Sequence, residues 1–129
     1  MLTKWCRVFQ GLPGEVPHAR HFVASLLADR GPADDAVLVV SELATNALRH
    51  TMSGSDGGRF FVIVGLGDDV VRIEVVDQGG ELVPHLCHAT DREEGGRGLR
   101  LIAALAKNWG YTVWRDGRSV WAELARANV

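Results

Sequence analysis

The stretch RFFVIVGLGDDVVRIEVV, residues 59–76, contains two runs rich in valine, isoleucine and phenylalanine. Such residues favour strands, and Gly65-Leu66-Gly67-Asp68 between the runs is typical of a hairpin loop. We therefore predict two antiparallel strands, residues 59–66 and 69–76. This hairpin decides the fold class, because antiparallel strands joined by short loops need no crossover helix.

Two helices are predicted before the hairpin. Pro17 suits the first turn of a helix that Gly31-Pro32 stops. Asp34 or Asp35 can cap a second helix, which runs to about His50. In both segments the apolar residues lie three or four positions apart, as a buried helical face requires. The two helices are therefore expected to cover a sheet.

The remaining elements are one strand near the N-terminus and three elements near the C-terminus. We predict a strand at 4–9, a helix at about 97–107, and strands at 111–115 and 119–124 around an Asp116-Gly117 turn. The order β-α-α-β-β-loop-α-β-β predicts an α+β fold in a single domain, residues 1–129. Its sheet is expected to be mixed but mostly antiparallel, with the helices on one face in a two-layer sandwich.

Composition excludes several classes of protein. The chain has 129 residues, a net charge of −2 and 47% hydrophobic residues. It has no apolar run of the roughly 20 residues that a membrane span needs, and no apolar leader follows Met1. The near-neutral charge gives no reason to bind nucleic acid or a membrane surface. Cys6 and Cys87 are too few and too far apart for a disulfide framework. We expect a cytoplasmic protein.

Three polar patches could carry chemistry. Glu42, Asn46 and His50 follow one another at intervals of four, so they lie on one face of the second helix. A carboxylate, a carboxamide and an imidazole in one row can bind a hard cation and orient a nucleophile. The alternative is an ordinary solvated helix face.

The second patch is Asp77-Gln78-Gly79-Gly80, directly after a predicted buried strand. Its aspartate can accept a hydrogen bond from an amino group, although Asp-x-Gly is also common in plain turns.

The third patch is Glu94-Gly95-Gly96-Arg97-Gly98-Leu99, in which a glycine-rich stretch leads directly into a predicted helix. Free amides at a helix start can bind phosphate, and the alternative is a hinge. The third patch is not a P-loop, since no Gly-Lys-Ser/Thr follows.

Taken together, in this order and spacing, the three patches resemble the GHKL ATP-binding superfamily. The resemblance covers nearly the whole chain and is closest to the small bacterial anti-sigma-factor serine/threonine kinases. It implies the corresponding ATP-binding fold, with ATP and Mg²⁺ as ligands.

The resemblance also implies roles for individual residues. Asn46 would ligate Mg²⁺, Glu42 one turn earlier would be the catalytic general base, and His50 would lie near the phosphates. Asp77 would accept a hydrogen bond from the adenine amino group, and Gly79 would let the base lie close.

The second glycine motif would contact the phosphates. Gly96 and Gly98 would supply backbone amides, with Leu99 ending the motif, and Arg97 would contact the γ-phosphate or a partner. Ser119 falls near a threonine of the family that touches the adenine edge.

The implied activity is phosphorylation of a serine on an anti-sigma-factor antagonist, together with sequestration of a sigma factor by a homodimer. One departure motivates an alternative. Glu81 replaces the usual last glycine or proline of the first glycine motif, and the segment 81–94 that follows is short. A non-catalytic, nucleotide-binding interaction module that regulates transcription or signalling is therefore the alternative.

Overall fold

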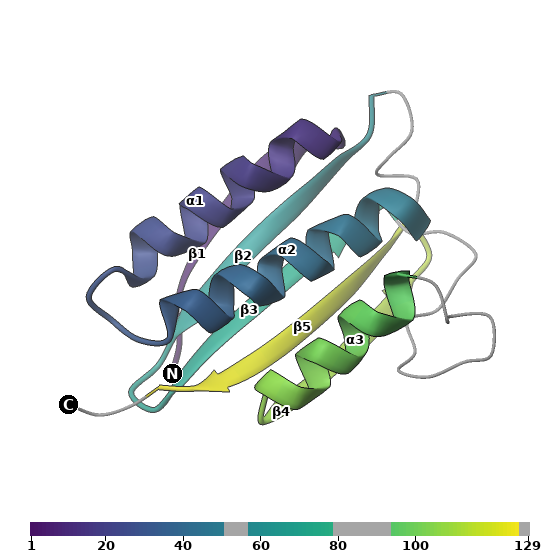
Figure 1. Ribbon diagram of the computed structural model, residues 1–129. Helices are drawn as coiled ribbons and strands as arrows, with labels where there is room; N and C mark the ends of the chain where they lie inside the picture. The colour runs from purple at the N-terminus through teal and green to yellow at the C-terminus, as the bar shows by residue number, and fades with distance from the viewer. Residues whose placement is uncertain (51–56, 79–93, 127–129) are drawn as a thin grey trace.

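A computed structural model describes residues 1–50, 57–78 and 94–126 (Figure 1). The side chains of residues 50 and 94–98 are outside this description. In chain order the helices and strands are β1 (Thr3–Gln10), the short 3₁₀ helix η1 (Pro13–Glu15), α1 (Val16–Leu27), α2 (Ala33–His50), β2 (Arg59–Leu66), β3 (Val70–Asp77), α3 (Glu94–Leu105), β4 (Asn108–Trp114) and β5 (Gly117–Ala125). This order confirms the predicted α+β fold.

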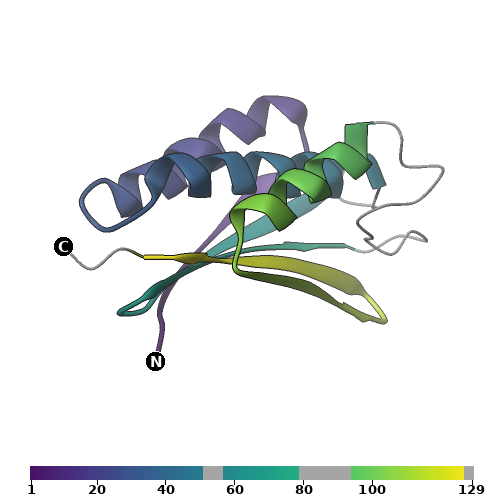
Figure 2. The same ribbon diagram turned by 60° about the horizontal axis from the view of Figure 1, so that its bottom comes forward.

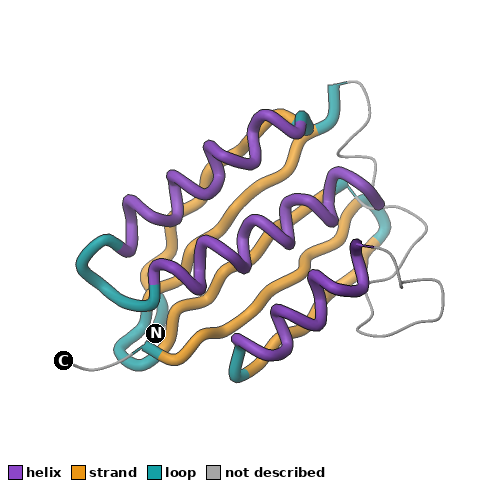
Figure 3. The backbone as a smooth tube through the Cα atoms, viewed as in Figure 1, coloured by secondary structure: helices purple, strands orange, loops and turns teal. Residues whose placement is uncertain are grey.

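The five strands form one sheet in the order β1-β2-β3-β5-β4. Each neighbouring pair is antiparallel, so the sheet contains none of the parallel pairing that a mixed sheet would have. The helices α1, α2 and α3 lie along the strands on one face (Figures 2 and 3). The two-layer arrangement follows, because each helix buries one apolar face against the sheet.

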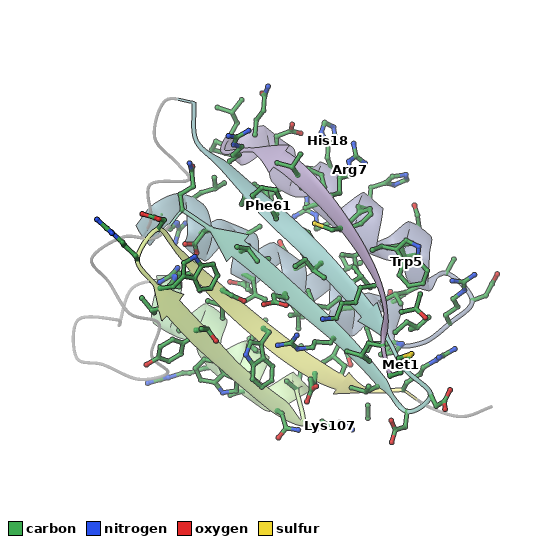
Figure 4. The ribbon with its side chains drawn as sticks, turned by 180° about the vertical axis from the view of Figure 1, so that it is seen from behind. Met1, Trp5, Arg7, His18, Phe61 and Lys107 are labelled. Atoms are coloured by element: carbon green, nitrogen blue, oxygen red, sulfur yellow. The ribbon has the colours of Figure 1, made fainter. Side chains whose placement is uncertain are left out.

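The core lies between the two layers, and buried residues alternate with more exposed ones along β3 and most of β2. On β2, the Phe60 side chain is fully buried whereas 38% of Phe61 is exposed. The Phe60 ring stacks on Phe9 of β1 with centroids 5.4 Å apart, and Phe22 of α1 meets Phe9 edge-on at 6.1 Å. Figure 4, which shows the sheet from behind, labels Phe61 on the face away from the helices. One face of the sheet therefore packs against the helices and the other is left uncovered by them.

Two helices begin earlier than predicted. α2 starts at Ala33, so Asp34 and Asp35 lie in its first turn and not at its cap. Negative charge is favourable there because it faces the positive end of the helix dipole. α3 starts at Glu94 instead of residue 97 and ends at Leu105. None of the helices in the described part of the chain is long and apolar enough to cross a membrane.

The turn between β4 and β5 is also displaced by one residue. It consists of Arg115 and Asp116, and Gly117 is already paired with Trp114. A Cβ atom on Gly117 would lie 2.9 Å from the Asp77 carbonyl oxygen and 2.9 Å from Nε1 of Trp114. Glycine at this position therefore lets the start of β5 approach the end of β3 closely.

Candidate functional site

The ends of four elements meet at one end of the molecule. The C-terminal end of α2, the end of β3 and the beginnings of α3 and β5 lie there together, in both views of the ribbon (Figures 1 and 2). Packing of α2 against β3, β5 and α3 holds them in this arrangement. The fold thus brings together the three patches that the sequence separates, at least as far as their described parts extend.

Asn46 lies on the inner side of this end of α2. It is only 8% exposed, and within the described residues its carboxamide makes no hydrogen bond. Buried polar side chains are almost always hydrogen-bonded, so a buried side chain without a partner in the described structure requires an explanation. A ligand that forms a hydrogen bond or a metal bond with the carboxamide would explain it.

Glu42 precedes Asn46 by one helical turn and is half-buried. Its carboxylate makes neither a hydrogen bond nor an ion pair with any residue that the structure describes. The neighbouring polar groups are engaged with one another. Nη1 of Arg20 donates to the hydroxyl of Ser41 at 3.2 Å, and the Thr45 hydroxyl donates to the Ser41 carbonyl at 2.7 Å. Glu42 is therefore available as a proton acceptor beside Asn46.

Asp77 is the last residue of β3 and is directly opposite Arg118 of β5. Nε of Arg118 donates to Oδ2 of Asp77 at 3.1 Å, and the two side chains are only 4% and 1% exposed, respectively. This buried ion pair was missed from the sequence. Its sequence signal is the alternation of Val120, Ala122 and Leu124, which puts Arg118 on the helix-covered face of β5.

Ser119 does not join the site. It is opposite Val76 in the antiparallel register, and its hydroxyl donates to a carboxylate oxygen of Glu74. Since side chains alternate along a strand, Ser119 and Glu74 lie on the face of the sheet opposite Asp77. The expected contact of Ser119 with a base held by Asp77 is therefore corrected, and the β5 residue on the same face as Asp77 is Arg118.

The second glycine motif is part of α3. Gly96 is the third residue of the helix, and its N–H is among the four at a helix start that have no partner within the helix. Gly98 is the fifth residue, so helical geometry directs its N–H to the carbonyl of Glu94. An anion at this end of α3 would meet the amide of Gly96 and not that of Gly98. The side chain of Leu99 is 5% exposed and belongs to the hydrophobic core, which removes it from the expected ligand contacts.

Three predicted site residues cannot be placed fully. His50 is the last residue of α2 and Arg97 lies in the first turn of α3, but their side chains are outside the described part of the structure. Gly79 lies outside the described residues altogether. Their expected roles stay predictions.

The donor set at this end suits a divalent cation shared with a phosphate ligand. In the described ranges no three histidine, cysteine, aspartate or glutamate side chains are grouped as a metal site. Mg²⁺ needs no such group, because it is commonly held by one or two protein oxygens, waters and phosphate oxygens. The amide oxygen of Asn46, which accepts no hydrogen bond from the part of the chain that the structure describes, fits that requirement.

The chain matches a known protein family. Residues 9–124 match the model described as a histidine kinase-like ATPase domain. This range includes all three patches, all of β2, β3 and β4, and β5 except Ala125, whereas it reaches only the last two residues of β1. A comparison with curated proteins gives no significant match.

Proposed function

The chain belongs to the histidine kinase-like ATPase family, and we propose that it is a protein serine/threonine kinase of the anti-sigma-factor type. In this proposal it binds ATP with Mg²⁺ and phosphorylates a serine of an anti-sigma-factor antagonist. As a homodimer the protein also sequesters a sigma factor. The antagonist would displace the sigma factor from the kinase, and phosphorylation of the antagonist prevents this. Family membership supports ATP binding, and the resemblance of the motifs supports the more specific role.

The buried carboxamide of Asn46, which has no hydrogen-bond partner among the described residues, carries the proposal. Its oxygen would hold Mg²⁺, which when bound would neutralise charge on the ATP phosphates. The amide of Gly96 at the start of α3 would receive a phosphate oxygen. Asp77 at the end of β3 would accept a hydrogen bond from the 6-amino group of adenine.

Glu42 would act on the phosphate acceptor. Its carboxylate accepts the proton of the serine hydroxyl as the serine oxygen attacks the γ-phosphorus. A bond forms between that oxygen and phosphorus, the bond from phosphorus to the β,γ-bridging oxygen breaks, and ADP leaves with the bonding electron pair. The products are phosphoserine and ADP, and the proton remains on Glu42 until solvent removes it.

The test measures ATP binding and phosphate transfer separately. Glu42→Ala should retain the ATP affinity in calorimetry and lower transfer of labelled phosphate to the antagonist by about 10²–10⁴-fold. Asp34→Asn, in the exposed first turn of the same helix, is the matched control and should change neither. Wild-type protein that binds ATP but transfers no label to the antagonist would exclude the kinase.

A non-catalytic interaction module is the second candidate, favoured by Glu81 in the first glycine motif. It predicts that nucleotide binding alone regulates the partner. Glu42→Ala would then leave sigma-factor binding and its dependence on ATP unchanged. Under the kinase proposal the same variant still binds the sigma factor but no longer inactivates the antagonist.

A further inference from the structure

Arg118 and Asp77 form a buried ion pair between neighbouring strands. The two residues are direct cross-strand neighbours, their side chains are almost fully buried, and Nε of Arg118 is 3.1 Å from Oδ2 of Asp77. A charged pair is costly to bury, and hydrophobic residues of similar volume would often stabilise the protein as well or better. Stability alone therefore gives little reason for an arginine at this position.

We propose that Arg118 is a positioning residue that fixes the orientation and the negative charge of the Asp77 carboxylate, so that the site selects 6-amino purines over 6-oxo purines. The inference rests on the proposed function, since it takes Asp77 as the group that meets the purine. It assigns the selectivity to a second residue, on β5, that does not itself contact the base.

The selectivity follows from hydrogen-bond chemistry. An ionised carboxylate only accepts hydrogen bonds, so it pairs with a 6-amino group and repels a 6-oxo group. A neutral carboxyl group can donate, and it would accept a 6-oxo purine as well. Burial favours the neutral form of a carboxyl group, whereas an adjacent guanidinium favours the ionised form. Arg118 thus determines whether the nucleotide contacts the ionised or the neutral form of the Asp77 carboxyl group.

The backbone around Arg118 holds it in place. Gly117 brings the start of β5 against the Asp77 carbonyl, where any side chain would collide. On β4 the cross-strand neighbour of Arg118 is Val113, and the next inward pair of β3 and β5 is Val75 with Val120. These neighbours are apolar, so within the two flanking strands Asp77 is the charged group that faces the guanidinium. An ionised carboxylate has about four lone-pair positions, so one hydrogen bond from Nε does not by itself saturate it.

The experiment compares ATP with inosine triphosphate, which has an oxygen in place of the 6-amino group. Calorimetry on wild type should show a preference for ATP of about 10- to 100-fold, the range for a hydrogen bond to a charged group. Arg118→Lys keeps the charge and should keep the preference. Arg118→Met should lose most of it, chiefly by binding inosine triphosphate better relative to ATP. Arg115→Met, at the exposed turn, is the matched control and should behave as wild type.

The possible results separate the inference from the proposed function. If Arg118→Met keeps the wild-type preference, or binds ATP more tightly, Arg118 is a structural or occluding residue and the inference is wrong while the function stands. If wild type binds neither nucleotide, the proposed function fails first. Far-UV circular dichroism confirms folding of each variant. Arg118→Gln, which keeps a donor but no charge, replaces Arg118→Met if that variant is unfolded and should lose the preference in the same way.

Discussion

The hydroxyl of Ser119 donates a hydrogen bond to the carboxylate of Glu74 on the face of the sheet that the helices leave uncovered. Glu74 also accepts a hydrogen bond from Nη1 of Arg72 at 3.2 Å, and the Arg72 guanidinium lies 4.8 Å from the centre of the Trp121 ring. These residues form a polar cluster between β3 and β5. The sheet separates this cluster from the Asp77 carboxylate, although Ser119 is adjacent in sequence to Arg118.

Ser119→Ala should therefore leave the affinity for ATP unchanged. The variant should lose about 1.5–3 kcal/mol of stability, the usual contribution of a hydrogen bond to a charged group. Calorimetry with ATP and urea unfolding measure the two effects. The control is Thr112→Ala. Thr112 is the exposed cross-strand neighbour of Ser119 on β4, and truncating its side chain should change the free energy of unfolding by no more than about 0.5 kcal/mol. A large loss of ATP affinity in Ser119→Ala would contradict the placement of the site on the helix-covered face.

Asn46→Leu should abolish ATP binding without lowering the stability of the ligand-free protein. Because the buried carboxamide has no hydrogen bond in the described residues, an apolar side chain of similar size removes a desolvation cost. Without nucleotide, the free energy of unfolding should stay equal or rise by about 1–3 kcal/mol. ATP binding measured with Mg²⁺ should be lost.

Asn108→Leu is the control for that change. Its amide is exposed and donates to Glu123 at 3.2 Å, so removing it should not stabilise the protein. If Asn46→Leu instead destabilised the ligand-free protein by several kcal/mol, the carboxamide would have an internal partner, and its assignment as a metal ligand would lose its basis.

The fold could be predicted from the sequence because its periodicities are strong. The sequence predicts the hairpin of β2 and β3 to within one residue, and apolar spacing predicts both N-terminal helices. The start of α3 was placed three residues late, since Gly95 and Gly96 are poor helix formers. Burial of Leu99 and Ile102 further along stabilises this helix, as their spacing in the sequence predicts.

The site was only partly predictable from the sequence. The four-residue spacing of Glu42 and Asn46 is local, so their common helix face followed from the sequence. Arg118 is 41 positions from Asp77, and their contact depends on which strand lies beside β3 in the sheet. That neighbour is β5, the last strand, because β4 occupies the edge. Alternation along β5 was nevertheless sufficient to show that Ser119 and Arg118 face opposite ways.

Gly117→Ala should destabilise the protein through a steric clash. Its Cβ would lie 2.9 Å from both the Asp77 carbonyl oxygen and Nε1 of Trp114, and the first of these is backbone that cannot easily move. We expect a loss of about 1–3 kcal/mol in urea unfolding. Gly14→Ala is the matched control, because a Cβ atom there would have no atom within 4 Å apart from the adjacent backbone, and the φ of Gly14 is not positive. That variant should be neutral or more stable by about 0.4–1 kcal/mol. Equal stability of the two variants would show that β5 does not approach β3 as closely as described.

The ion pair of Arg118 and Asp77 should show strong coupling in a double-mutant cycle. Removing either partner takes the counter-ion at 3.1 Å away from a buried charge, so Arg118→Met and Asp77→Leu should each cost about 3–5 kcal/mol. The double variant buries two apolar side chains of comparable size and should recover most of the stability. Urea unfolding without nucleotide, at a temperature where all four proteins are folded, measures the coupling free energy. Additive losses in the double variant would mean that the two charges do not compensate one another inside the protein. If the double variant recovers nearly all of the wild-type stability, the ion pair is dispensable for folding. This result is expected if Arg118 is retained for nucleotide selectivity and not for stability.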